Sequence, residues 1–211
     1  MLSIYNSITC GMMTAGGEVC QMTVYWCDIT RQLAEPEGFL RWCGGRRIMP
    51  ETYLCLADAV RHFAGEELQR LARQDGTPYT SVSHSGALVL CACADHPVGI
   101  DAEELAPVPS IPPRFFTTAE TVWMRTQHDP VRAFYRLWTR KESLIKVDRS
   151  VLSDMLVLPE LVENGVLRTR VGALTLSEPA ILPERFCVSL CCEGSGNAEL
   201  IHIPAETLFA H

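Results

Sequence analysis

The stretch that organises this sequence is PVRAFYRLWTRKESLIK, residues 130–146. Its apolar positions recur at helical spacing, which predicts an amphipathic helix. Glu142 and Lys146 are four positions apart, so they share one face of that helix, one turn from each other. A different side is expected to anchor the helix in the core through three apolar residues, Leu137, Leu144 and Ile145. The stretch therefore predicts a helix with a buried side and a charged side.

A second stretch, VGIDAEEL at residues 98–105, is typical of an apolar strand that ends in carboxylates. Side chains alternate along a strand, so Asp101 and Glu103 point to one face if the strand continues that far. Two interpretations are open at this point. The carboxylates belong to a solvated strand end, with Glu142 and Lys146 as an ordinary surface ion pair. Alternatively, the two stretches meet and Glu142 faces the acidic pair.

The second interpretation brings three carboxylates together. Each like-charge pair at ~4 Å would cost on the order of 4 kcal/mol at an effective dielectric constant of about 20. A hard divalent cation removes that cost, and all-oxygen ligation suits Mg²⁺, with Mn²⁺ as an alternative. Lys146 would then lie beside a metal-bound phosphate as a compact positive charge, an arrangement typical of phosphoryl-transfer sites.

A third stretch, SVSHSG at residues 81–86, is expected at the junction between a loop and a strand at residues 87–94. Small hydroxyls, an imidazole and a glycine hold phosphates in such places through side chains and backbone amides. The plainer interpretation, in which His84 is an ordinary surface or core histidine, also stands. His84 and Ser85 do not indicate a serine hydrolase, because the chain has no G-x-S-x-G elbow.

The remaining pattern predicts an α/β chain of the α+β type, with an N-terminal lobe at residues 1–97 and a C-terminal lobe at residues 98–211. Residues 1–21 are expected to form an extension or a weak strand. The other expected elements are strands at residues 22–29, 87–94, 98–101 and 185–192, and a helix at residues 118–126. Two interruptions are also expected: a flexible basic turn at residues 44–47, and a break at Ala64-Gly65 in the helical segment from Pro50 to about Gln74.

The composition of the 211 residues excludes several function classes. With 18 Lys and Arg against 25 Asp and Glu, the formal net charge of −7 argues against a general nucleic-acid-binding protein. No apolar stretch reaches the roughly 18 residues that a membrane span needs, and no charged segment precedes an apolar one as in a signal peptide. We therefore expect a soluble, cytoplasmic protein without a membrane partner.

The cysteine and lysine contents are both unusual. The ten cysteines include no C-x-x-C pair, so they are expected to be buried free thiols rather than zinc ligands. Only two residues are lysines, Lys141 and Lys146, and they lie five positions apart. Either this is drift in a chain that prefers arginine, or these two positions require an ammonium group.

Taken together, the three stretches resemble the ordered motifs of the surfactin-type 4′-phosphopantetheinyl transferases. A helical W-T-x-K-E-S-x-x-K combined with G-I-D-x-E is specific, and the resemblance spans about residues 22–192. It implies a pseudo-two-fold pair of similar lobes, each a small antiparallel sheet packed by a long helix, with the active site in the cleft between them. It also implies the reaction, in which the phosphopantetheine arm of CoA moves to a serine of an apo acyl or peptidyl carrier protein and 3′,5′-ADP is released.

The resemblance implies a role for individual residues. Asp101, Glu103 and Glu142 would hold Mg²⁺, and Glu142 would also take the proton from the carrier serine. Lys146 would neutralise the CoA pyrophosphate and assist the departing ADP. The CoA phosphates would also be contacted by a set of residues from the first lobe: Arg41, Arg46, Arg47, Ser83 and His84. Trp138 is expected to be structural, and the role of Lys141 stays open.

The resemblance has departures and leaves the partner unnamed. Thr77 stands where the family commonly has a lysine, and the segment Val147-Asp148-Arg149-Ser150 follows Lys146 where a glycine is typical. The acidic helices of a carrier protein are expected to meet a basic face of a monomeric enzyme, with the candidates Arg114, Arg125, Arg132 and Arg136. Two alternatives remain: a non-catalytic carrier-protein-binding module and an Mg²⁺-dependent phosphohydrolase.

Overall fold

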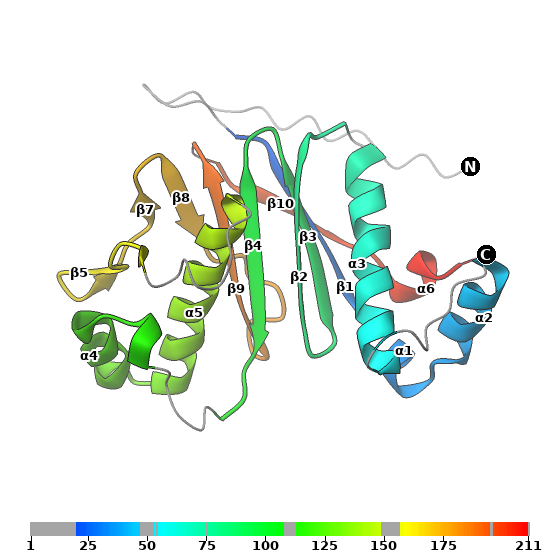
Figure 1. The fold of residues 1–211 in the computed structure, drawn as a ribbon, viewed down its shortest axis with the longest axis horizontal. Coiled ribbons are helices and arrows are strands. Elements are labelled where there is room, and N and C mark those ends of the chain that lie inside the picture. Colours follow the sequence, from blue (N-terminus) through cyan, green and yellow to red (C-terminus); the bar gives the residue numbers. More distant parts are fainter. Residues whose placement is uncertain are drawn as a thin grey trace.

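The structure of the chain is a computed structural model, which describes residues 20–46, 53, 55–74, 76–107, 113–148, 157–194 and 196–210. Most of the expected extension at residues 1–21, Arg47 and the expected helix start at Pro50 therefore lie outside the described residues. The fold is of the mixed helix-and-strand class that the sequence predicts, with two four-stranded sheets side by side between long helices (Figure 1).

The first sheet has the strand order β10–β1–β3–β2. Its strands are β1 (Met22–Asp28), β2 (Tyr79–Ser85), β3 (Leu88–Ala94) and β10 (Ala198–His202). β3 pairs antiparallel with both β1 and β2, whereas β10 pairs parallel with β1. A strand from near the end of the chain thus joins the sheet that contains the first described strand.

The second sheet has the order β4–β9–β8–β7 and is antiparallel throughout. Its strands are β4 (Val98–Glu104), β7 (Arg170–Val171), β8 (Leu174–Ser177) and β9 (Phe186–Glu193). A separate hairpin pairs β5 (Val162–Glu163) with β6 (Val166–Leu167). Its turn uses positive φ angles of 51° at Asn164 and 75° at Gly165, the conformation for which an Asn-Gly turn is suited.

Two long helices cover the outer sides of the sheets (Figure 1). The helices are α1 (Thr30–Ala34), α2 (Glu37–Arg46), α3 (Leu56–Gln74), α4 (Thr118–Thr126), α5 (Pro130–Val147) and α6 (Ala205–Leu208), with a 3₁₀ turn at Pro113–Phe115. α3 packs on the first sheet and α5 on the second. None of the helices in the described ranges is long and apolar enough to cross a membrane.

Strand alternation distributes the apolar side chains over three cores. In β3, Leu88 and Leu90 enter the central core between the two sheets, while Val89 and Cys91 enter the core under α3. The third core lies under α5, and it includes the residues expected to anchor that helix, Leu137, Leu144 and Ile145. The predicted buried side of the helix at residues 130–146 is therefore confirmed.

Two expected interruptions are wrong. The helix α3 continues through Ala64-Gly65, because Gly65 faces β2 and lets the helix approach it: a Cβ at this position would lie 3.0 Å from Val82 Cγ1. The expected turn at residues 44–47 is also helical as far as Arg46, since α2 is held by a buried face that contains Phe39, Trp42 and Cys43. Packing overrides the low helix propensity of glycine in both places.

The placement of residues 81–86 at a loop junction is wrong as well. Residues Ser81–Ser85 belong to strand β2, which pairs with β3 along its whole length. Only the turn follows, and there Gly86 has a φ of 54°. The sequence pattern did not predict this strand because its buried positions, Ser81 and Ser83, are serines rather than apolar residues. Serine is not a typical strand former.

The expectation of buried free thiols is confirmed for the described cysteines, of which Cys55 alone is exposed. Burial raises the pKa of Cys27, Cys91 and Cys191 to about 12. These thiols therefore stay protonated at neutral pH and act as small apolar side chains.

Candidate active site

Strand β4 and helix α5 bring two of the predicted motifs together. On β4, Ile100 and Ala102 enter the central core, so the alternating residues Asp101 and Glu103 lie on the opposite face. From α5, Lys146 reaches that face and places its Nζ 2.7 Å from Asp101 Oδ1. The strand does continue to Glu104, and the two stretches do meet in space.

Gly99 sets the distance between β4 and α5. A Cβ at this position would lie 2.0 Å from the carbonyl oxygen of Ser143 and 2.9 Å from the amide nitrogen of Val147. Both atoms belong to the backbone of α5, so no side-chain rotation relieves the overlap. The glycine of the G-I-D-x-E motif therefore lets α5 approach closely enough for Lys146 to reach Asp101.

Replacing Gly99 by Ala is expected to push α5 away from β4 and to lower the free energy of unfolding by about 1–3 kcal/mol, the usual cost of overpacking. Urea unfolding measures the change. Gly44→Ala is the matched control, because a Cβ there meets nothing within 4 Å and alanine favours the helix. If Gly99→Ala is as stable as Gly44→Ala, the close approach of the helix does not depend on the glycine.

The surroundings of Asp101, Glu103 and Glu142 disfavour the charged form of their carboxyl groups. Burial raises the pKa of Asp101, and the nearby ammonium of Lys146 opposes the shift. Burial also raises the pKa of Glu103 and of Glu142, and for Glu142 the negative charge of Asp101 adds to the effect. The carboxylates therefore repel one another, as the second interpretation of the sequence requires, and a positive charge among them relieves that repulsion.

The donor atoms of the site partly match a divalent cation. No group of three or more His, Cys, Asp or Glu side chains in the described ranges is gathered closely enough to hold a metal ion. However, Asp101 Oδ2 is buried without a hydrogen-bond partner, and a buried carboxylate oxygen is costly when it is left unpaired. The oxygen-only donor set and this orphaned oxygen fit Mg²⁺ or Mn²⁺.

The neighbours Ser83 and His84 point in opposite directions. The buried Ser83 hydroxyl donates to Asp101 Oδ1 at 2.9 Å, so it is already committed to a protein group. His84 is exposed on the other face of β2, and its pKa is lowered by partial desolvation and by the charge of Arg61. Arg61, on α3, donates from Nε to the carbonyl oxygen of Gly86 at 2.8 Å and pairs with Asp58 at 3.0 Å.

Arg61 is a candidate that the sequence did not reveal. Its position beside His84 depends on how α3 packs on β2, and a helical pattern alone does not give that orientation. By contrast, the predicted phosphate contacts Arg41 and Arg46 lie on α2, which Figure 1 places on the far side of α3 from β4. Arg46 covers the ring of Trp42 at 4.4 Å, and Arg47 lies outside the described residues.

Lys141 does not join Asp101, Glu103 and Glu142 but forms a buried ion pair elsewhere. Its Nζ lies 2.9 Å from Glu120 Oε2, and both side chains are at most 2% exposed. The Glu120 carboxylate also accepts the amide N–H of Leu161 at 2.8 Å and of Thr117 at 3.0 Å. The pair therefore ties α5 to α4 and to the segment around Leu161. The role left open for Lys141 is structural.

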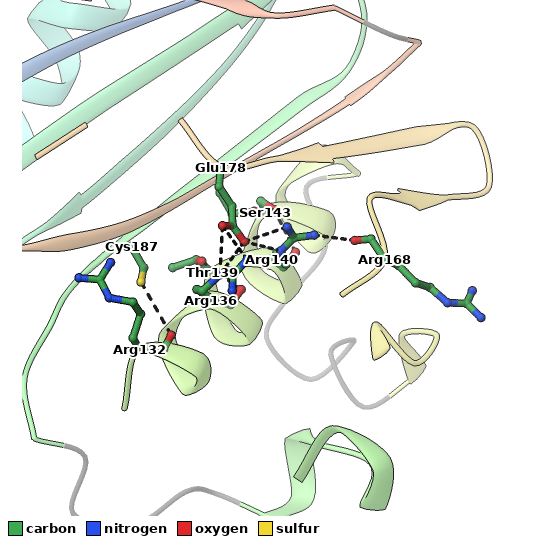
Figure 2. Close-up of polar contacts among 9 residues, drawn as sticks. Arg132, Arg136, Thr139, Arg140, Ser143, Arg168, Glu178 and Cys187 are labelled. Carbon is green, nitrogen blue, oxygen red and sulfur yellow. Dashed lines mark hydrogen bonds and ion pairs between the residues drawn. The ribbon is translucent and has the colours of Figure 1, made fainter. Parts of the chain in front are cut away.

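The arginines expected to contact a carrier protein differ in whether they already bind other residues of this chain. Arg136 Nε lies 3.1 Å from both carboxylate oxygens of Glu178, and Arg140 Nε lies 2.8 Å from Oε1 of the same residue (Figure 2). Arg132 donates from Nη2 to the carbonyl oxygen of Pro183 at 2.9 Å. Of the four candidates, Arg114 and Arg125 are the exposed ones.

Comparisons with known proteins match the part of the chain that contains two of the three motif stretches, residues 98–105 and 130–146. Residues 97–196 match the 4′-phosphopantetheinyl transferase superfamily. The 4′-phosphopantetheinyl transferase gsp of Aneurinibacillus migulanus is 42% identical over 44% of this chain and 50% of that protein. The 4′-phosphopantetheinyl transferase Sfp of Bacillus subtilis (strain 168) is 38% identical over 35% of this chain and 34% of that protein. The matches thus span half or less of these relatives, and within that span the resemblance is confirmed.

Proposed function

We propose that this chain transfers the phosphopantetheine arm of CoA to an apo acyl or peptidyl carrier protein, and the match of residues 97–196 to the 4′-phosphopantetheinyl transferase superfamily supports the proposal. The carrier serine oxygen forms a bond to the phosphorus that bears the arm. The bond from that phosphorus to the bridging pyrophosphate oxygen breaks, and 3′,5′-ADP leaves. The observation that carries the proposal is the contact of Lys146 with Asp101, which joins the two motifs.

We call the surface formed by Asp101, Glu103, Glu142 and Lys146 the acidic face. Each of these residues has a separate role in the reaction. Glu142 accepts the serine proton, directly or through water, and burial together with the negative charge of Asp101 raises the pKa of its half-buried carboxyl group, which makes the carboxylate a stronger base. Lys146 is a compact ammonium beside the pyrophosphate and stabilises the charge of the departing ADP. Asp101, Glu103 and Glu142 would hold Mg²⁺, which would supply further charge neutralisation on the pyrophosphate.

The phosphates of CoA require further contacts, and we place one of them beside His84. Its exposed imidazole and the guanidinium of Arg61 lie together at the end of β2, within reach of the charge of Lys146. Arg41, Arg46 and Arg47 remain proposed contacts of the 3′-phosphate. The pairing of Arg61 with the Gly86 carbonyl holds the guanidinium at this end of the strand.

The transfer is tested by the mass of the acceptor. The protein is incubated with CoA, Mg²⁺ and a panel of apo acyl and peptidyl carrier proteins, and each carrier is weighed by mass spectrometry. We expect at least one carrier to gain the mass of one phosphopantetheine group. Unchanged masses across the panel would refute the transferase, and release of inorganic phosphate instead would indicate a phosphohydrolase.

Lys146→Arg is expected to slow transfer roughly 10²-fold, the scale of a misplaced catalytic group. The ammonium sits 2.7 Å from Asp101 in a partly enclosed place, and a planar guanidinium does not fit the same position. Steady-state kinetics with a responsive carrier measures the change. Arg73→Lys, at the exposed C-terminal end of α3, controls for the exchange of cation type, and unchanged kinetics in Lys146→Arg would show that an ammonium is not required at position 146.

A further inference from the structure

The two sheets meet at strands β2 and β4, which lie side by side in Figure 1 although each is the edge strand of a different sheet. Backbone pairing does not join them. Instead, three alternating serine hydroxyls of β2 accept the N–H groups of β4: Ser81 from Ile100 at 3.1 Å, Ser83 from Ala102 at 3.2 Å and Ser85 from Glu104 at 3.0 Å. We call Ser81, Ser83 and Ser85 the serine row.

Two members of the serine row make a second bond. Ser83 Oγ donates to Asp101 Oδ1 and Ser85 Oγ donates to Glu103 Oε2, each at 2.9 Å. A hydroxyl carries one proton. Because each oxygen already accepts a backbone N–H of β4, its proton is left for the carboxylate of the preceding β4 residue. The backbone of β4 thus fixes the direction in which each serine donates.

We propose that Ser83 and Ser85 are positioning residues that hold one oxygen of Asp101 and of Glu103 so that the acidic pair presents its remaining oxygen atoms to a divalent cation. Asp101 shows this division, since Oδ1 is bonded to Ser83 and Lys146 while Oδ2 is buried without a partner. The inference rests on the proposed function, in which these two carboxylates hold the cation. Residues that hydrogen-bond to metal ligands without touching the metal themselves typically change the metal affinity when they are replaced.

The serine row contains its own control. Ser81 makes the same backbone contact as the other two, but the β4 residue that precedes its partner Ile100 is Gly99, which has no carboxylate. If the role of the serine row is purely structural, Ser81→Ala, Ser83→Ala and Ser85→Ala should have equal effects on stability and on cation affinity. A positioning role predicts that only the last two affect the cation, while all three weaken the junction between the sheets.

The test measures Mn²⁺ affinity by electron paramagnetic resonance of the free ion, in the presence of CoA and without any carrier protein. We expect Ser83→Ala and Ser85→Ala to weaken Mn²⁺ binding about 10- to 100-fold, and Ser81→Ala to leave it unchanged. Urea unfolding should show a lower midpoint for all three variants. Ser85→Thr, which keeps the hydroxyl, should restore Mn²⁺ affinity.

Three results would overturn the positioning role: no Mn²⁺ binding by the unaltered protein, equal affinity in all variants, or the same loss in Ser81→Ala as in the other two. A failure of the proposed function can be distinguished from a failure of the positioning role. If no carrier gains mass while the Mn²⁺ affinities follow the expected pattern, the serine row positions the carboxylates and the transferase assignment alone is refuted.

Discussion

Glu142→Gln is expected to lower the rate of phosphopantetheine transfer by about 10²–10⁴-fold, the range for loss of a general base, while the fold stays intact. The variant keeps the size of the side chain and loses its charge, so the proposed proton acceptor and one proposed cation ligand are lost together. The carboxylate is repelled by Asp101 and Glu103. Removing the charge therefore relieves strain, and stability is expected to be equal or higher.

Single-turnover transfer and urea unfolding of the same preparation separate the two effects. Glu199→Gln is the matched control, because Glu199 is an exposed residue of β10 on the sheet that does not contain β4. A slow but stable Glu142→Gln protein supports the assignment. Full activity in this variant would show that Glu142 neither accepts the proton nor holds the cation.

Lys141→Met is expected to lower the free energy of unfolding by about 3–5 kcal/mol, the cost of leaving one partner of a buried ion pair behind. Glu120 is 0% exposed and would keep a buried carboxylate whose charge is no longer paired. Two backbone N–H bonds to Glu120 remain, so part of the carboxylate is still satisfied. The junction of α4 with α5 should nevertheless loosen first.

Urea unfolding of Lys141→Met is compared with Arg125→Met, which removes an exposed cation from α4 and should stay within about 0.5 kcal/mol of the unaltered protein. A double variant, Lys141→Met with Glu120→Gln, should recover part of the loss because the stranded charge is gone. A loss below about 1 kcal/mol in Lys141→Met would contradict a structural role for this ion pair.

The acidic face was predictable because it follows from local rules. Alternation along β4 places Asp101 and Glu103 on one side, and helical spacing places Glu142 and Lys146 on another. Whether the two sides meet depends on the packing of α5 on β4, which Gly99 permits. The sequence contained that glycine, but its close contact with the helix backbone is visible only in the fold.

The serine row was not predictable for a different reason. Ser81, Ser83 and Ser85 look like loop residues until β4 is known to lie beside them, because their partners are backbone N–H groups of another sheet. The parallel pairing of β10 with β1 is equally non-local. Local patterns carry no information on either contact.

The two lysines show how composition and structure complement each other. Their scarcity raised the question of whether these positions require an ammonium group. The structure gives each one a carboxylate partner: Glu120 for the buried Lys141, and Asp101 for the partly exposed Lys146. The first contact joins elements of the fold, and the second belongs to the proposed chemistry.

The most direct measurement follows both products of one reaction. Released 3′,5′-ADP and modified carrier are quantified together, with CoA and Mg²⁺ in excess over a responsive apo carrier and over the same carrier with its acceptor serine replaced by alanine. A transferase predicts one 3′,5′-ADP for each modified carrier and neither product with the alanine carrier. Release of 3′,5′-ADP without modification of the carrier would contradict the proposed transfer.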